Sequence, residues 1–401
     1  MRKGIMMKEM STKVYIALFS LAISAFAIGT TEFVIVGLLQ TVADDLSISV
    51  TKAGALISGY AVAIAVGTPI VTAITGRIPK KGFLLILMMV FILGNAFSTI
   101  AGTYELLMIS RVITAIAHGV FFAIAATVAA DIVPENKRGT AISIMFTGLT
   151  VATIAGVPMG TYIGQEFGWR ATFGAVAILG IIGLIVNVFA VDKVSRPTNP
   201  PTLKDVGQLV KNKRILLALL MTALGFGGTF ALFTYLAPIL ETISGYSAGS
   251  ISLLLLVYGV AVAIGNIVGG KMANQHPVKS LRFVFLLQGI VLLLQIILLP
   301  SKGLSILSII LLGLFAFMMS PGVQAYIVML AEKLVPSAKD IASALNISAF
   351  NVGIAAGSTL GGLAVNYLTY LDTAWIGAIM VAFAFLLSVL NYKLDKKQKL
   401  F

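Results

Sequence analysis

The sequence predicts an all-α integral membrane protein with twelve transmembrane helices. Three observations support this prediction: 59% of the residues are hydrophobic, only 11% are charged, and long apolar runs recur along all 401 residues. A soluble domain has about 45–50% apolar and about 25% charged residues. This chain therefore lacks the polar side chains to cover its own surface, and we expect the lipid bilayer to surround it.

Each apolar run is long enough for a helix that crosses the hydrocarbon core, which takes about 20 residues. The runs are continuously apolar and do not alternate with polar residues, which argues against a strand barrel. In chain order, the expected spans are residues 14–38, 51–75, 82–101, 104–130, 139–163, 171–191, 214–240, 250–270, 281–300, 304–331, 340–366 and 373–392. The first span follows Lys8 and Lys13 as a signal peptide would, but it is too long and has no small-residue cleavage site.

The loops between the spans indicate the orientation of the chain. With the N-terminus in the cytoplasm, 24 of the 28 Lys and Arg residues fall in cytoplasmic loops and tails, as the positive-inside rule expects. The net charge of +13 therefore needs no nucleic-acid partner. Because the chain has no cysteine and only two histidines, we expect no disulfide and no thiolate or multi-His metal site.

The two halves of the chain repeat each other. Residues 58–67 (SGYAVAIAVG) and 256–265 (LVYGVAVAIG) match at five of ten positions with an offset of 198. At an offset of 202, the Val-Pro-x-x-Lys of residues 133–137 matches that of residues 335–339. Since each repeat has an even number of spans, both halves enter the membrane in the same orientation. We expect a six-helix bundle over residues 1–191, a Pro-rich cytoplasmic linker over 192–213 and a second six-helix bundle over 214–401.

This arrangement of two parallel six-span repeats resembles the major facilitator superfamily, and local motifs carry the same resemblance. The loop TGRIPKKG (residues 75–82) is similar to the family's Gly-x-x-x-Asp-Arg-x-Gly-Arg-Arg motif. Arg77, Lys80 and Lys81 keep the basic character of that motif, although its acid is absent, which leaves a basic loop that contacts helix ends. RVITAIAHGVFFA resembles the family's fourth-span motif, with Arg111 and Gly119 on matching positions.

The fifth span, GLTVATIAGVPMGTYIG, resembles the Gly- and Pro-rich motif of efflux antiporters. The matching residues are Gly148, Gly156, Pro158, Gly160 and Gly164. The resemblance implies that they form a hinge between two transport states, whereas close helix packing is the alternative, since small residues let helices approach and Pro removes a backbone donor.

Together with TEFVIVGLL and GWRATF, these motifs are similar to the twelve-span drug:proton antiporter family, which exports drugs, sugars and purines. This resemblance implies the major facilitator fold and a proton-coupled exporter that needs no cofactor. It further implies a multi-pass protein of the cell membrane with both termini cytoplasmic. Its partners would be lipid, protons and a small-molecule substrate, and we expect it to work as a monomer.

Three ionisable residues lie well inside the expected spans: Glu32, Arg111 and His118. Such residues are costly in hydrocarbon and are by default functional. We expect Glu32 to couple transport to protons, with packing between helices as the alternative. Arg111 and His118 are seven residues apart and share a helix face. Arg111 could hold Glu32 charged, bind an anion or satisfy helix carbonyls, and His118 could titrate or bond a backbone carbonyl.

Asp131 lies at the cytoplasmic end of the fourth span and is expected to join a boundary network with Lys137 and Arg138. Aromatic and amide residues of several spans could line a central cavity, although each aromatic could equally serve packing. The candidates are Phe33, Phe121, Phe122, Phe146, Tyr235, Tyr326, Asn346 and Asn351. Such a cavity would suit a planar, moderately apolar solute, a drug or nucleobase better than a free sugar.

Other function classes fit the sequence less well. No GxxxxGK[ST] motif is present, which argues against an ATP-driven pump. Nothing resembles a carbonyl filter or an acidic ring, as a channel would need, and no catalytic constellation suggests an enzyme. A proton-coupled exporter of a drug-like molecule, a nucleobase or nucleoside, or a sugar is the leading hypothesis. A facilitative uniporter, a channel-like carrier and an importer of a small metabolite stay open as alternatives.

Overall fold

Helices make up the described fold, because in hydrocarbon each backbone N–H and C=O must find its partner within the chain. The computed structural model describes residues 10–48, 50–191, 203–274 and 276–398. Within these ranges there are no strands, and twelve helical segments are long and apolar enough to span a membrane. The fold class predicted from composition and hydropathy is thus confirmed.

The first half contains seven helices, one 3-10 turn and one π turn. They are α1 (Thr12–Asp45), α2 (Val50–Thr75), α3 (Lys80–Ile100), α4 (Tyr104–Asp131), the 3-10 turn Glu135–Lys137, α5 (Arg138–Val151), the π turn Ala152–Gly156, α6 (Val157–Phe167) and α7 (Trp169–Ala190).

The second half begins with a short helix in the linker. Its elements are α8 (Leu203–Lys211), α9 (Lys213–Phe233), α10 (Leu236–Thr242), α11 (Ala248–Met272), α12 (Pro277–Leu298), α13 (Leu304–Ala316), α14 (Ser320–Leu334), the 3-10 turn Pro336–Ala338, α15 (Lys339–Tyr367) and α16 (Asp372–Gln398).

Three spans differ from the straight helices that the sequence suggests. The expected spans 139–163, 214–240 and 304–331 each contain two consecutive helices, namely α5/α6 with the π turn between them, α9/α10 and α13/α14. A proline lies at or just after each break, namely Pro158, Pro238 and Pro321, and its missing N–H interrupts the helical hydrogen bonds there. The expected linker contains α8, and its residues 192–202 lie outside the described residues.

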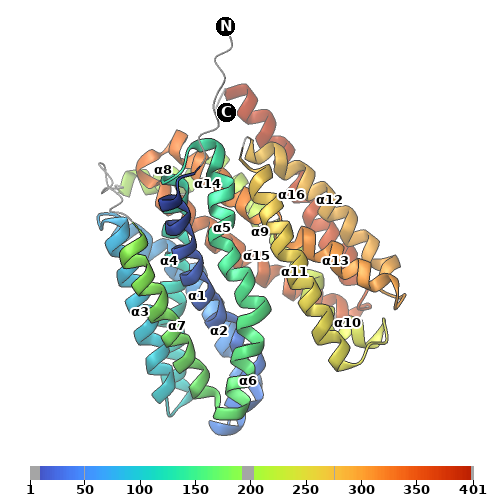
Figure 1. Cartoon of the computed structure of the whole chain (residues 1–401). Helices are drawn as coiled ribbons and strands as arrows, with labels where there is room; N and C mark the ends of the chain where they lie inside the picture. The colour runs from blue at the N-terminus through green and yellow to red at the C-terminus, as the bar shows by residue number, and fades with distance from the viewer. Residues whose placement is uncertain (1–9, 49, 192–202, 275, 399–401) are drawn as a thin grey trace.

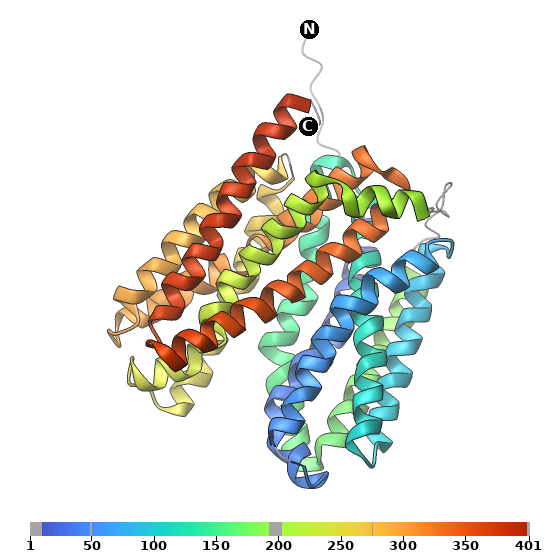
Figure 2. The same cartoon turned by 180° about the vertical axis from the view of Figure 1, so that it is seen from behind.

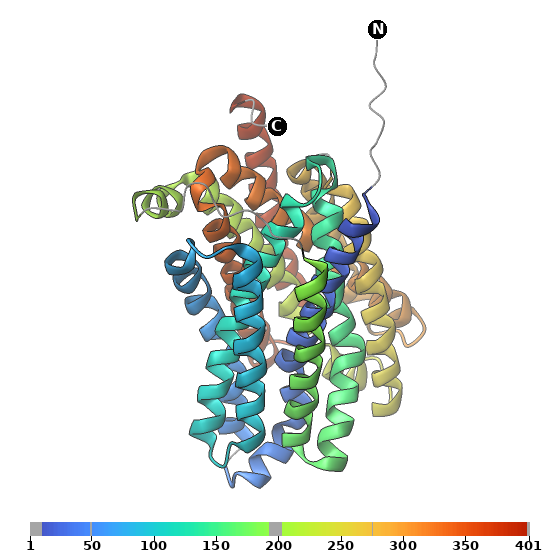
Figure 3. The same cartoon turned by 60° about the vertical axis from the view of Figure 1, so that its left-hand side comes forward.

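The helices form two bundles, α1–α7 and α9–α16 (Figures 1 and 2). The start of α1 and the end of α16 lie at one end of the molecule, which we call the termini end, and the opposite end is the distal end. The bundles approach each other at the termini end and diverge toward the distal end (Figure 1). Helix α8 lies across the termini end (Figures 2 and 3).

Within each bundle, glycines let two helices meet backbone to backbone. A Cβ on Gly148 of α5 would meet the carbonyl oxygen of Ala22 in α1. In the second bundle, a Cβ on Gly357 of α15 would meet the carbonyl oxygen of Gly227 in α9. Because such contacts leave no room for a side chain, we expect each bundle to move as a unit.

A polar cluster ties the distal end of the first bundle together. The Asp45 carboxylate accepts hydrogen bonds from the Trp169 Nε1–H at 3.1 Å and the Arg170 guanidinium at 2.7 Å. Arg170 also donates to the carbonyl oxygen of Ala101 at 2.9 Å. The bond from Arg170 holds the pKa of the Asp45 carboxyl below its usual value. Asp45 is therefore charged near neutral pH and anchors the end of α1 to the start of α7.

Candidate functional site

A narrow cavity lies where the two bundles meet. One wall comes from α1, α4 and α5, and the other from α9, α14 and α15. Its lining residues are Glu32, His118, Phe122, Phe146, Leu149, Phe226, Ser320, Val323, Gln324, Asn346, Ile347, Phe350 and Asn351. About 20 Å³ is free for the centre of a water-sized sphere, which is room for about one water molecule. The cavity is almost closed in this conformation.

Glu32 belongs to a short polar series on the first bundle's wall. Its carboxylate Oε2 lies 3.9 Å from the Nε2 of His118, and the side chains of Glu32 and His118 are only 16% and 6% exposed. The other ring nitrogen of His118, Nδ1, is 3.1 Å from the Tyr60 hydroxyl of α2. If the Tyr60 O–H donates to Nδ1, His118 carries its proton on Nε2, facing the carboxylate. Glu32, His118 and Tyr60 therefore form one connected series.

Arg111 lies next to this series and bonds to the backbone. Its guanidinium donates to the carbonyl oxygen of Thr31 at 2.6 Å and lies 4.1 Å from the centre of the Tyr60 ring. No ion pair within 4.0 Å joins Arg111 to Glu32 in the described part of the chain, where His118 is the nearest ionisable partner of the carboxylate. Of the roles that the sequence left open for Arg111, the geometry favours satisfying a helix carbonyl beside the acid.

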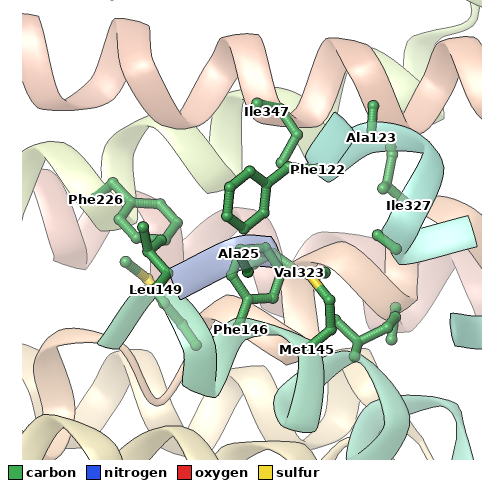
Figure 4. Close-up of a cluster of buried hydrophobic side chains, with 14 of the residues drawn as sticks. Ala25, Phe122, Ala123, Met145, Phe146, Leu149, Phe226, Val323, Ile327 and Ile347 are labelled. Atoms are coloured by element: carbon green, nitrogen blue, oxygen red, sulfur yellow. The ribbon is translucent and has the colours of Figure 1, made fainter. Parts of the chain in front are cut away.

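Aromatic rings make up much of the cavity wall. Phe122 and Phe146 stack with ring centroids 5.5 Å apart (Figure 4). The ring of His118 lies 5.0 Å from that of Phe122. Across the cavity, Phe226 and Phe350 pack edge to face at 3.9 Å. The cavity thus offers flat apolar surfaces from both bundles, with the titratable groups on the first bundle only.

Amides supply the polar groups of the second bundle's wall. Asn346 donates from Nδ2 to the Oε1 of Gln324 at 2.6 Å, and both side chains line the cavity. Asn351 donates to the carbonyl oxygen of Ile347 at 3.0 Å and leaves its own carbonyl oxygen for other partners. No three His, Asp or Glu side chains of the described residues gather as metal ligands.

The structure brings half of the cavity candidates together: Phe122, Phe146, Asn346 and Asn351 line the cavity. The others lie elsewhere. Phe33 and Phe121 pack into the hydrophobic core, and the Tyr235 hydroxyl donates to the carbonyl oxygen of Ser358. Tyr326 accepts from Arg214 at 3.0 Å, away from the cavity.

Several lining residues were missed by the sequence reasoning, among them Phe226, Ser320, Gln324 and Phe350. Gln324 had the clearest signal, as an amide within an apolar span. The others look like ordinary apolar or small residues of a membrane helix until their position is known.

The span-5 motif follows α1 closely. A Cβ on Gly156 would meet the Thr30 side chain, and Cβ atoms on Gly160 and Gly164 would meet Val34 and Leu38. Gly148 approaches the α1 backbone, as described above, and Pro158 is exposed two residues after the π turn. π turns inside α-helices are frequent at functional sites. The motif thus combines close packing against the helix of Glu32 with an irregular turn.

Ion pairs between the bundles gather at the termini end. Between the bundles, Lys80 is 2.8 Å from Asp340 and Lys339 is 2.6 Å from Asp131, and within the first bundle Lys80 is also 3.1 Å from Asp131. Arg138 pairs with Glu332 at 2.6 Å. We call this set of charged residues the seam.

The seam differs from the expected boundary network. Asp131 pairs with Lys80 and Lys339 rather than with Lys137 and Arg138, because the start of α3 brings Lys80 and the second bundle brings Lys339 to this end. Lys81 bonds the carbonyl oxygen of Val188 near the end of α7, and Arg77 is exposed.

Comparisons with known proteins match this architecture. Residues 21–334 match the profile of the Major Facilitator Superfamily. The MFS-type transporter YtbD of Bacillus subtilis (strain 168) is 49% identical over 96% of this chain and 97% of its own. The inner membrane transport protein YdhP of Escherichia coli (strain K12) is 38% identical over 94% of this chain and 95% of its own.

Solved structures share the fold at low identity. The proton:xylose symporter XylE has a TM-score of 0.75 at 15% identity, covering 94% of this chain and 95% of its own. The transporter FucP in its outward conformation has a TM-score of 0.75 at 16% identity, covering 94% of this chain and 98% of its own. The family consists of transporters of small solutes and not of enzymes. The chain, whose described residues form twelve spans in two bundles, belongs to the major facilitator superfamily.

Proposed function

We propose that the protein is a proton-coupled secondary transporter that exports a small molecule by alternating access. The observation that carries this proposal is a carboxylic acid, Glu32, set beside His118 in an almost closed cavity between two bundles. A buried acid at such a position can take up a proton in one conformation and release it in another. Movement of the second bundle away from this wall changes the hydration of the Glu32 carboxyl, and hydration changes its affinity for a proton.

The seam supports the alternating-access part of the proposal. The bundles are joined by ion pairs and hydrogen bonds at the termini end and diverge toward the distal end. A conformation of this kind would let solute leave or enter at the distal end. To expose the cavity at the termini end, the ion pairs of Asp131 and Arg138 to the second bundle must separate. If the termini are cytoplasmic, this is the outward-facing state.

The cavity walls support a planar, moderately apolar solute. Two pairs of phenylalanines offer flat surfaces, and the amides of Gln324, Asn346 and Asn351 offer a few hydrogen bonds. Ligand sites are mostly apolar with a few placed polar groups. We infer that a drug-like molecule or a nucleobase fits this cavity better than a free sugar does.

Transport into inverted membrane vesicles tests the function. We expect a solute from a panel of aromatic drugs, nucleosides and sugars to accumulate when the vesicle interior is acidified, and to leak out when a protonophore removes the gradient. Vesicles without the protein are the control. If no solute of the panel moves against its gradient, or if accumulation survives the protonophore, proton-coupled export is contradicted.

The orientation is a second testable expectation. We propose that the protein lies in the plasma membrane as a monomer with both termini in the cytoplasm. A reporter fused after Phe401 and another inserted at Pro200 in the linker should then both report from the cytoplasm. A reporter inserted after Lys302, between α12 and α13, should report from outside. An external signal from either of the first two would overturn the orientation or the number of spans.

A further inference from the structure

Four consecutive hydrogen bonds connect the cavity wall of the second bundle to helix α4 of the first bundle. The Thr222 hydroxyl of α9 donates to Asn346 Oδ1 at 2.7 Å, and Asn346 Nδ2 donates to Gln324 Oε1 at 2.6 Å. Gln324 Nε2 donates to Ser343 Oγ at 2.6 Å, and the Ser343 hydroxyl donates to the carbonyl oxygen of Ala123 in α4 at 2.7 Å. We call this series the relay. All four side chains are at least nine-tenths buried.

In every bond of the relay the donor lies on the Thr222 side and the acceptor on the Ala123 side. The carbonyl group of Ala123 explains this common direction. A carbonyl oxygen only accepts, so the single hydroxyl proton of Ser343 is committed to it. Ser343 Oγ must then accept from Gln324, which has to present its NH2 group there and its oxygen to Asn346. Such head-to-tail bonds polarise one another, so each strengthens the next.

The middle of the relay lies on the cavity, and its last bond crosses from one bundle to the other. Gln324 and Asn346 line the cavity, whereas Ser343 lies one helical turn beyond Asp340 of the seam. On α4, Ala123 lies two turns before Asp131, on the same face of the helix. The amides that face a solute are therefore hydrogen-bonded, through a single serine, to the opposite bundle.

We propose that the relay couples the orientation of the cavity amides to opening at the termini end, with Ser343 as the positioning residue. The inference rests on the proposed alternating access. If a cavity occupant turns the Gln324 amide, its oxygen faces Ser343 in place of its NH2 group. The Ser343 hydroxyl then donates to Gln324 and leaves the Ala123 carbonyl, so one bond between the bundles is lost. In contrast, a serine that only packs α15 against α4 would not respond to changes at the far end of the relay.

The absence of cysteine from the chain makes this coupling measurable. Ala273 of the second bundle is 2% exposed and faces Gly139 of the first, so Ala273→Cys reports opening at the termini end. In purified protein, we expect Ser343→Ala to raise the rate of labelling by a hydrophilic maleimide about three- to tenfold, the effect of one net hydrogen bond. We expect Thr222→Val, which removes the first donor of the relay and its longer contact to the Ala218 carbonyl oxygen at 3.2 Å, to raise the rate as well.

The double variant Ser343→Ala with Thr222→Val tests whether Thr222 influences the labelling rate through the hydrogen bonds of the relay. We expect it to label no faster than Ser343→Ala alone, because both changes act on the same bond to Ala123. The proposal would be overturned if the increase in labelling rate of the double variant equalled the product of the two single increases, or if Thr222→Val left the rate unchanged.

Matched substitutions control for folding and for general loosening. Ser348→Ala removes a hydroxyl from the same helix that bonds only the carbonyl of Ala344, at 3.2 Å, and Ser343→Thr keeps the relay hydroxyl. Both should label at the unmodified rate, and an increase in either would contradict the specific role of Ser343. Because this assay uses neither a solute nor a proton gradient, its outcome is separate from that of the vesicle assay.

Discussion

Glu32→Gln is expected to abolish uphill, proton-driven transport while substrate binding and downhill exchange survive. Gln keeps the shape of Glu beside His118 and can still hydrogen-bond, but it cannot exchange a proton. One charge moved through 100 mV supplies about 2.3 kcal/mol, which sustains a solute gradient of about fiftyfold. In the variant we expect this gradient to fall to one, measured as accumulation in inverted vesicles under an imposed pH difference.

Glu166→Gln is the matched control for this experiment, because it makes the same chemical change at an exposed residue near the end of α6. It should accumulate solute as the unmodified protein does. If Glu32→Gln still builds a gradient at the unmodified rate, Glu32 is not the coupling site. The same assay would then be applied to His118 and Asp131.

Gly156→Val is expected to lower the transport rate about ten- to hundredfold without preventing membrane insertion. A Cβ at this position would meet the side chain of Thr30 in α1, two residues from Glu32. Overpacking of this kind costs about 1–3 kcal/mol, and here it falls on the contact between the π turn and the helix that carries Glu32. The rate would be measured in vesicles at matched protein levels.

Gly82→Val makes the same change where a Cβ has no neighbour within 4 Å, and it should transport normally. A normal rate in Gly156→Val would show that the close contact with Thr30 matters for packing alone. A loss of membrane insertion would place its effect in folding and would contradict the expected role in the transport cycle.

The spans could be predicted from the length of the apolar runs. Most of the polar series around Glu32 could also be predicted, for a physical reason. In an apolar chain an ionisable residue is costly, so Glu32, Arg111 and His118 stand out without any structure. Tyr60 did not stand out, because a tyrosine is an ordinary residue of a membrane helix. Only the structure shows that its hydroxyl lies 3.1 Å from the Nδ1 atom of His118 and so belongs to the polar series.

Contacts between the bundles could not be predicted from the sequence. Lys80 and Asp340 are separated by 260 positions in the chain, and no local pattern pairs them. The same holds for the amides: Gln324 and Ser343 become neighbours only because α14 and α15 pack together. Periodicity and composition describe each helix by itself, whereas the seam and the relay depend on how helices from both halves pack together.

The repeat has a consequence for how such a protein can diversify. At the offset of 202, His118 corresponds to Ser320 and Phe122 to Gln324, and all four line the cavity. Duplicated positions thus face the same space with different chemistry: the first copy supplies an imidazole and a phenyl ring, the second a hydroxyl and an amide. At the offset of 198, Glu32 corresponds to a phenylalanine, Phe230. If Glu32 is the coupling site as proposed, a descendant of this chain could acquire a new cargo through substitutions in its second copy, while the first copy keeps the proton site.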